Sequence, residues 1–492
     1  MLRQAETRVQ AVMEPATLEF HVAEPVVEQL QAARLPLPVP IPVPIPIPLP
    51  LLLGSRVMIW KQDPSVGALG RRLSFIPELL LNGPQNARID TSLPGTTPVV
   101  RNVNGDFIFP TFSPESDCVH TFSVILQTLR MWQQTRGKNI PWAWNTGGNT
   151  TRITCNPRAF SGANAFYSRL GKSLSFGFFI PQGSANQVFT CRSLDVVSHE
   201  AGHAVLDGIK PGWLGTGNVA QTGALHEAFG DLTAVFMGLS HFDQVDLVVA
   251  MSKANLHDKN FISAVAEQFG LSLVPPRLTG LRNADNNLKL SQVSNEVHAL
   301  SQVFTGAIYD ILADIFVHER IKQSGRKELT QILFEVAQHL RKLLLAAIEK
   351  APAVGATFAD VANEMIKKSK AQGDPPIYRT FIKNRFTVRE VVVSATPLTA
   401  LTEQIGTMDY ANEKYTADAG DVAELQATAH VSCLAGVAQD RSGCCGTMQL
   451  PEYARTEKAL NAELKDLALS KQIVPDEVLL ATEYKELARS FA

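Results

Sequence analysis

The sequence predicts an α+β fold with a β-rich N-terminal lobe over residues 55–192 and a helical C-terminal lobe over residues 193–390. Short apolar runs separated by Gly, Pro and Asn clusters are typical of strands, and they dominate the first lobe. After residue 193 the apolar residues recur at helical spacing instead. The segment HEAGH, at 199–203, lies at this change of pattern. We therefore expect its helix at the junction of the lobes, a common location for a cleft.

The individual elements follow from the same patterns. In the first lobe, a run of apolar residues at helical spacing ends at Gly137, a residue that commonly terminates helices. This helix is expected over 120–137, and strands are expected at SRVMIW (55–60), RNVNGDFIF (101–109), TRITC (151–155) and SLSFGFFI (173–180). In the second lobe, helices are expected over 193–209, 223–239, 297–316 and 327–350.

Two flanking segments fall outside these lobes. Residues 1–54 form an N-terminal extension that shows no signal peptide, which favours the cytoplasm or an unconventional export route. Within it, LPLPVPIPVPIPIPLP (35–50) is apolar, but alternating proline prevents a membrane-spanning helix, so we expect a polyproline-type spacer or a docking segment. Residues 391–492 contain amphipathic helical patterns, and no chemistry can be assigned to them.

Composition excludes several classes of protein. Among 492 residues, 45 Lys and Arg oppose 47 Asp and Glu, so no broad basic field is available for nucleic acid or anionic lipid. No transmembrane segment is expected. Six scattered cysteines are too few for a disulfide scaffold and form no C-x-x-C pattern. Function must therefore come from a local site, and the oligomeric state is not indicated.

The segment HEAGH carries the strongest chemical signal. His199 and His203 are four residues apart on an expected helix, so their imidazoles rise from one face and can share a metal ion. Glu200 follows the first histidine, where a carboxylate can reach a metal-bound water without displacing an imidazole. Zinc suits this arrangement because it keeps an open coordination position and lowers the pKa of bound water to about 7.

The segment GALHEAFGD, at 223–231, supplies the remaining groups. Glu227 is the candidate third ligand, and Asp231, one turn later, can accept a hydrogen bond from the outer nitrogen of a ligating histidine. His226 is a competing ligand, but adjacent helical positions point some 100 degrees apart. The longer metzincin pattern fails because Leu206 and Ile209 stand where it needs glycine and histidine.

Together, LDVVSHEAGHAV and GALHEAFGD resemble the paired signature of thermolysin-like neutral zinc metallopeptidases, and the resemblance extends over about residues 110–390. It implies a zincin fold and metalloendopeptidase activity on peptide or protein substrates. In GANAFY, it implies that Asn164 and Ala165 bind the substrate backbone. Arg282, in TGLRNADNN, resembles the arginine that contacts a substrate carbonyl, and His298, in EVHALSQVF, resembles the histidine that stabilises the tetrahedral intermediate.

Several positions depart from that family. The stretch between His203 and Glu227 is about four residues longer than the family pattern and lacks its tyrosine, a second oxyanion donor. No carboxylate stands near Val293, where the partner of the downstream histidine is expected, although Glu296 could replace it. The calcium-binding acidic cluster is not recognisable even though Asp195 is retained, so calcium is not implied. Asp195 and Asp207 are expected to fix helix ends or to contact ligands from behind.

The resemblance and the residues together predict zinc-dependent peptide hydrolysis. Zinc polarises the peptide carbonyl, Glu200 takes a proton from the attacking water, and His298 with zinc stabilises the oxyanion. Two alternatives stay open. One is a catalytically silent, zinc-stabilised binding protein with a relic cleft, which the missing tyrosine favours. The other is a zinc hydrolase that acts on something other than peptides.

Overall fold

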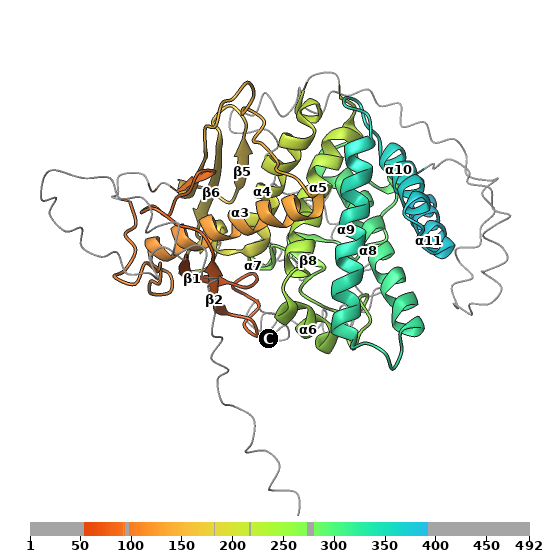
Figure 1. Cartoon of the computed structure of the whole chain (residues 1–492), viewed down its shortest axis with the longest axis horizontal. Helices are drawn as coiled ribbons and strands as arrows, with labels where there is room; N and C mark the ends of the chain where they lie inside the picture. The colour runs from red at the N-terminus through yellow and green to blue at the C-terminus, as the bar shows by residue number, and fades with distance from the viewer. Residues whose placement is uncertain are drawn as a thin grey trace, which may run out of the picture. The chain divides into compact units, whose positions relative to one another are not determined.

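The computed structural model describes residues 54–91, 93, 98–181, 183–215, 218–272 and 280–391. These residues belong to one compact unit, in which most strands lie before residue 190 and helices dominate afterwards (Figure 1). The fold is therefore α+β, as the sequence predicts. The Pro-rich segment 35–50 and the extension after residue 391 lie outside the described residues.

The main sheet occupies the first part of the chain. Its strands are β3 (Ile89–Thr91), β4 (Ile153–Ser161), β5 (Ala165–Ser168), β6 (Ser173–Phe179) and β7 (Val188–Phe189). Their order is β3-β4-β6-β5, and β7 also pairs with β6. The pairs β3/β4 and β4/β6 are parallel, whereas β5 runs antiparallel to β6. The strand β5 thus lies at the end of the sheet order and packs against the helix that carries HEAGH.

A separate antiparallel pair is formed by β1 (Ser55–Trp60) and β2 (Arg71–Ile76). The strand expected over 101–109 does not form; only Phe107 makes an isolated bridge, to Val57. The side-chain oxygen of Asn102 instead accepts hydrogen bonds from the backbone N–H groups of Asn104 and Asp106. This local alternative to strand pairing is a known property of asparagine, and here it makes a turn.

The helix α3 (Pro114–Arg136) begins and ends where the sequence provides caps. The hydroxyl of Ser113 accepts from the N–H of Ser116 at 3.1 Å, and proline occupies the first helical position. Gly137 adopts the left-handed conformation at φ 72°, and its N–H donates to the carbonyl of Gln133. The predicted C-terminal end of this helix is confirmed.

The next two helices cross closely. α4 (Leu194–Ile209) follows the short 3₁₀ turn η1 (Thr190–Arg192) and is capped by Ser193, and α5 (Ala220–Gly238) follows the turn η2 (Pro211–Leu214). A Cβ added at Gly202 would lie 2.8 Å from Oγ1 of Thr233 on α5. Glycine within HEAGH therefore allows the two helices to approach, which brings their polar side chains together.

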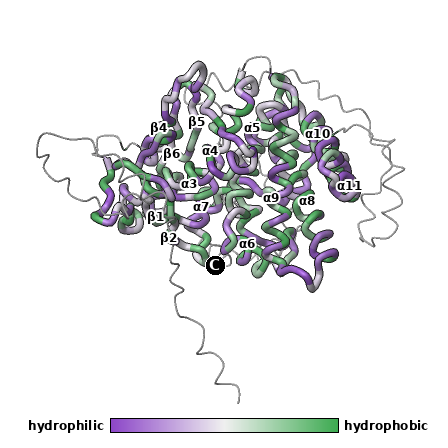
Figure 2. Tube along the Cα trace, in the orientation of Figure 1, coloured by the Kyte–Doolittle hydropathy of each residue, from purple (hydrophilic) through white to green (hydrophobic). Residues whose placement is uncertain are grey.

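The remaining elements complete the helical part. They are α6 (Phe242–Met251), β8 (Ala264–Val265), α7 (Glu267–Leu271), β9 (Arg282–Asn283), η3 (Leu290–Gln292), α8 (Val297–Lys322), α9 (Leu329–Lys350), α10 (Phe358–Ala371) and α11 (Pro376–Thr387). Figure 2 shows α8 as largely hydrophobic and α10 and α11 as mixed. α8 packs against α5, α9 and α11, so it lies inside the helical layer.

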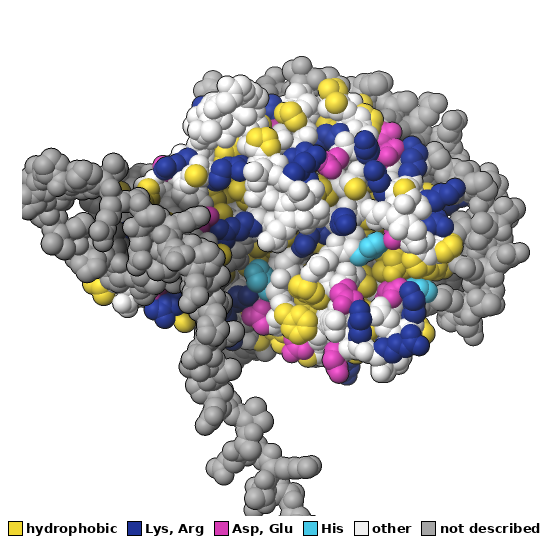
Figure 3. Space-filling model, in the orientation of Figure 1, with side chains coloured by type: hydrophobic (Ala, Val, Ile, Leu, Met, Phe, Trp, Pro, Cys, Tyr) yellow, Lys and Arg dark blue, Asp and Glu magenta, His cyan; other side chains and the backbone are white. Residues whose placement is uncertain are grey.

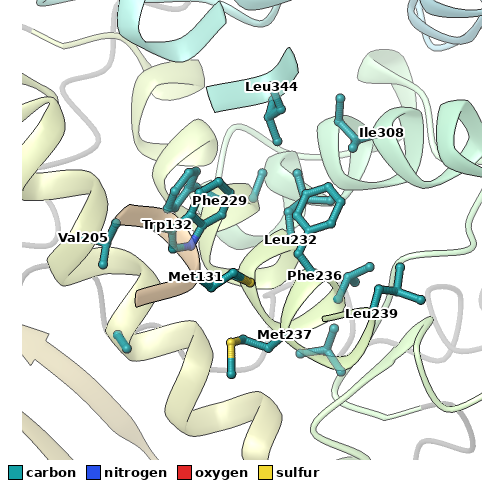
Figure 4. Close-up of a cluster of buried hydrophobic side chains, with 14 of the residues drawn as sticks. Met131, Trp132, Val205, Phe229, Leu232, Phe236, Met237, Leu239, Ile308 and Leu344 are labelled. Atoms are coloured by element: carbon teal, nitrogen blue, oxygen red, sulfur yellow. The ribbon is translucent and has the colours of Figure 1, made fainter. Parts of the chain in front are cut away.

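A cluster of aromatic side chains lies where α3 meets α5. Trp132 stacks on Phe229 with ring centroids 4.5 Å apart, and its Nε1–H donates to Oγ1 of Thr233 at 3.2 Å. The ring nitrogen of this buried indole is thus satisfied. Figure 4 shows the surrounding core, to which α3, α4, α5, α8 and α9 contribute Met131, Trp132, Val205, Phe229, Leu232, Phe236, Met237, Ile308 and Leu344.

The exposed surface carries both signs of charge. On the face drawn in Figure 3, Lys and Arg are interspersed with Asp and Glu, and hydrophobic side chains occur in small groups. Among the described helices, α8 alone is long and apolar enough to cross a membrane, while α5 and α6 reach that limit only as a bent pair. Because 89% of the apolar window of α8 is buried, it has the character of a core helix.

Candidate metal centre

The crossing of α4 and α5 gathers two imidazoles and a carboxylate. Nε2 of His199 lies 3.0 Å from Nε2 of His203, because four residues separate them on α4. The carboxylate of Glu227, on α5, approaches both: Oε2 lies 3.6 Å from Nε2 of His199, and Oε1 lies 3.7 Å from Nε2 of His203. All three side chains are fully buried. The candidate ligands of the sequence therefore meet at one point.

These donor atoms fit a zinc ion. With bonds near 2.0–2.1 Å, a four-coordinate zinc ion separates its ligand atoms by about 3.3 Å, close to the observed spacings. Two imidazoles and one carboxylate supply three ligands and leave one coordination position for solvent or substrate. Burial lowers the pKa of His199 to about 4, despite the opposing effect of Asp231, so this imidazole is neutral as a ligand must be.

Glu200 lies beside these groups in the same buried region. Its side chain has no exposed surface, and its negative charge contributes to raising the pKa of Arg282. The sequence places it on α4 next to His199, so it rises from the helix at a different angle. The carboxylate is therefore buried and follows the candidate ligand His199 directly in the chain.

Asp231 lies behind His199. Its Oδ1 accepts from Nδ1 of His199 at 2.9 Å, which leaves Nε2 to face the cluster. Arg282 donates from Nε and Nη2 to the same carboxylate, at 2.9 Å and 2.7 Å. Burial would raise the pKa of Asp231, but Arg282 and His199 outweigh it and lower the pKa to about 2. Asp231 is therefore ionised.

Arg282 makes a contact that the sequence did not predict, an ion pair with Asp231. The side chain is only 2% exposed, and two of its nitrogens are committed to Asp231. In the structure Arg282 holds the carboxylate of Asp231, which accepts from His199. A contact of Arg282 with a substrate carbonyl stays a prediction. Sequence spacing did not reveal this pairing, because the two residues lie on separate elements far apart in the chain.

His226, the competing ligand, lies on the far side of His203. Its Nδ1 is 2.6 Å from Nδ1 of His203, and the rings are nearly parallel at 18°. The nitrogen of His203 that faces Glu227 is Nε2, so His226 approaches the outer nitrogen instead. Burial, more than the nearby charges, lowers the pKa of His226 to about 3. Both imidazoles are therefore neutral.

His298 reaches the cluster from the first turn of α8. Its Nε2 lies 3.6 Å from Oε2 of Glu227, and its Nδ1 is hydrogen-bonded to Oε1 of Glu296. Glu296 also caps α8, because its carboxylate accepts from the N–H groups of His298 and Ala299. Glu296 thus stands where the sequence offered it as a substitute for the missing aspartate. Glu296 therefore both caps α8 and orients His298.

Each tyrosine of the described part of the chain directs its hydroxyl elsewhere. Tyr167 donates to Asp207, Tyr309 to the carbonyl of Leu256, and Tyr378 to Glu319. The stretch between α4 and α5 contains none. Among the described residues, the second oxyanion donor of the family pattern therefore has no tyrosine counterpart.

Asn164 and Ala165 lie at the start of β5. The side-chain oxygen of Asn164 accepts from the N–H of Ala165 at 2.9 Å, and its backbone carbonyl accepts from Gly177. Ala165 is buried, whereas Asn164 is half-buried. β5 packs against α4, so this end of the sheet adjoins the helix of the metal cluster. Their binding of substrate stays a prediction.

The two flanking aspartates of α4 have separate partners. Asp195 accepts from the N–H of Ala266 and lies near the carboxylates of Asp63 and Glu267. Burial, and then the charge of Asp63, raise the pKa of Asp195 well above its usual value. Asp207 accepts from Tyr167 and is paired with Arg169. Local sequence could not show the cluster at Asp195, because its members come from distant segments.

Comparison with known proteins finds similarity only at the level of structure. No protein-family model matches the sequence, and no curated protein is detectably similar to it. Among solved structures, the chain is similar to the precursor of protealysin, a metalloproteinase from Serratia proteamaculans, with 17% sequence identity and a TM-score of 0.41. The match covers 62% of this chain and 87% of that one. Function has to be inferred from the side chains.

Proposed function

We propose that this protein is a zinc-dependent metalloendopeptidase of the thermolysin-like type, with His199, His203 and Glu227 as ligands. The observation that carries the proposal is the meeting of these three buried side chains at distances that match one zinc ion, with Glu200 beside them. A purely structural zinc site has four protein ligands and no use for a neighbouring carboxylate. When bound, zinc would polarise a carbonyl and make water a nucleophile near neutral pH.

Glu200 and His298 carry out the proton transfer and the stabilisation of the oxyanion. Glu200 accepts a proton from the attacking water and returns it to the leaving amine, which is general acid–base catalysis. Nε2 of His298 donates to the oxyanion that develops on the substrate carbonyl, and Glu296 orients the imidazole through the hydrogen bond with Nδ1. With no tyrosine available in the described region, His298 carries this donation alone.

The substrate is proposed to be an extended peptide. A peptide can add to the end of the sheet at β5, where Asn164 and Ala165 offer backbone and amide groups. This strand packs on α4, so a bound peptide would pass the metal cluster. Surface charges of both signs give no reason to expect a nucleic acid substrate.

The experiment measures zinc content and hydrolysis of a quenched peptide library by the full chain. Glu200→Gln should retain zinc and lose at least about 100-fold in kcat, because the base is removed and the ligands remain. Glu364→Gln, in an exposed ion pair with Lys367, is the control and should match the wild type. Phenanthroline should abolish activity, and added zinc should restore it.

The outcomes separate the alternatives. A protein that binds zinc at this cluster and cleaves no peptide would favour a silent binding protein, an alternative that the missing tyrosine between His203 and Glu227 supports. Activity of Glu200→Gln close to the wild type would remove Glu200 from the role of base. Hydrolysis that resists chelation would remove zinc from the reaction.

A further inference from the structure

His203 lies between the side chains of two adjacent residues of α5. Glu227 faces its Nε2 at 3.7 Å, and His226 faces its Nδ1 at 2.6 Å. Adjacent helical residues point about 100 degrees apart, so two consecutive side chains can reach opposite edges of one imidazole that lies against the helix. The ring of His226 is fully buried, which leaves no room for the pair to separate into solvent.

The short contact between Nδ1 of His203 and Nδ1 of His226 determines which ring nitrogens carry a proton. Two ring nitrogens at 2.6 Å need one proton between them, since two lone pairs or two N–H groups would repel. A metal on Nε2 of His203 places the remaining proton of that imidazole on Nδ1. His203 then donates and His226 accepts, so the proton of His226 must be on Nε2.

That Nε2 is buried and has no hydrogen-bond partner among the described residues. A buried donor without a partner is unfavourable, and native structures keep such groups mainly at functional sites. The burial of this unpaired N–H is explained if Nδ1 of His226 has a role that outweighs the unfavourable free energy at Nε2.

We propose that His226 is a positioning residue, which holds His203 in the tautomer and orientation that present Nε2 to the metal. This inference rests on the proposed zinc site and extends it. His199 and His203 then differ in their outer partners: the first is backed by the ionised Asp231, and the second by a neutral imidazole. The protein thus orients both ligands but places only one buried carboxylate behind them.

The test replaces His226 in the full chain and measures zinc affinity by competition with a chelator. In His226→Asn the amide oxygen takes the place of Nδ1, so the acceptor is retained; in His226→Leu an apolar carbon takes that place. The leucine variant should bind zinc about 10- to 100-fold more weakly, and the asparagine variant should stay within about threefold of the wild type. His120→Leu is the control, because His120 is equally buried on α3 and accepts from the backbone N–H of Trp60.

Two further measurements separate a local change at the metal site from a failure to fold. Thermal unfolding of the metal-free variants should show that His226→Leu folds; if it does not, His226→Gln replaces it, since its amide lies at the Nε2 position and should weaken zinc binding. The visible spectrum of cobalt-loaded protein should change in the leucine variant and not in the asparagine variant. Wild-type zinc affinity in His226→Leu would overturn the inference, and so would equal losses in both variants. Absence of zinc binding in the wild type would instead reject the metal site itself.

Discussion

Oδ1 of Asp231 accepts a hydrogen bond from Nδ1 of His199 at 2.9 Å, so a carboxylate on α5 orients a ligand on α4. The same carboxylate is held by Arg282. Asp231→Asn should weaken zinc affinity about 10- to 100-fold, because the imidazole loses its charged partner. It should also destabilise the fold by about 3 kcal/mol, since Arg282 would be left buried without its counterion.

Chelator competition and chemical denaturation of the metal-free protein measure these two effects separately. Asp243→Asn, which removes the partially exposed partner of Lys61, serves as the control for loss of an ion pair. Zinc affinity that is unchanged in Asp231→Asn would show that His199 does not depend on this hydrogen bond.

Gly230 makes room for the ring of His199. A Cβ at this position would lie 2.7 Å from both Cε1 and Nδ1 of the imidazole. Gly230→Ala should therefore displace His199 and reduce zinc binding at least about tenfold. Gly67→Ala is the control, because a Cβ there meets no atom within 4 Å. Zinc titration of both variants checks this, and equal affinities would mean that α5 shifts to absorb the methyl group.

These positions show what the sequence could predict. His199 and His203 lie on one helix, where spacing alone decides that they share a face. Glu227 lies on the next helix, so its meeting with them was expected from the need for a third ligand and from the paired signature, not from spacing. The pairing of Asp231 with Arg282 joins different elements, and no local pattern reveals it. His226 was foreseen only as pointing away from Glu227; that His203 occupies this direction depends on how α4 crosses α5.

One of the four strand predictions, over 101–109, failed for a related reason, whereas β1, β4 and β6 form at the other three segments. RNVNGDFIF has the apolar residues of a strand, but the side-chain oxygen of Asn102 accepts from the backbone N–H groups of Asn104 and Asp106, which makes a turn there. In contrast, β2 and β5 were missed because RRLSFI and AFYS are short or charged, and their pairing depends on neighbours elsewhere in the chain.

Glu296 supports the proposed oxyanion donor. Glu296→Gln should lower kcat about tenfold and change KM less, because His298 loses the charged hydrogen-bond partner that orients its imidazole toward the developing oxyanion. Steady-state kinetics on one peptide substrate measures the split. Because Glu296 also caps α8, a melting curve must show that the variant is folded. A KM effect with kcat unchanged would place Glu296 in substrate binding.

A pH dependence of stability is expected from His257, whose partner is Asp285. Burial would lower its pKa, but the hydrogen bond to and charge of Asp285, with a contribution from Asp310, raise it from 6.5 to about 8 against the opposing charge of Arg385. Stabilisation by the charged His257 is therefore complete below pH 6.5 and is lost as pH rises through about 8.

The size of this effect is limited by solvent. The side chain of His257 is 37% exposed, so screening reduces its contribution to about 1 kcal/mol. Unfolding free energies of the wild type and His257→Asn, measured at several pH values, should differ most at about pH 6 and converge by about pH 9. A difference that grows with pH would contradict the assignment.

Zinc-edge X-ray absorption of the protein loaded with one equivalent of zinc tests the central claim most directly. The account predicts two imidazole nitrogens and light oxygen ligands at about 2.0–2.1 Å, with one imidazole lost in His203→Ala and an altered shell in Glu227→Gln. A shell that contains sulfur, or one that is identical in the wild type and both variants, would show that zinc binds elsewhere and would contradict it.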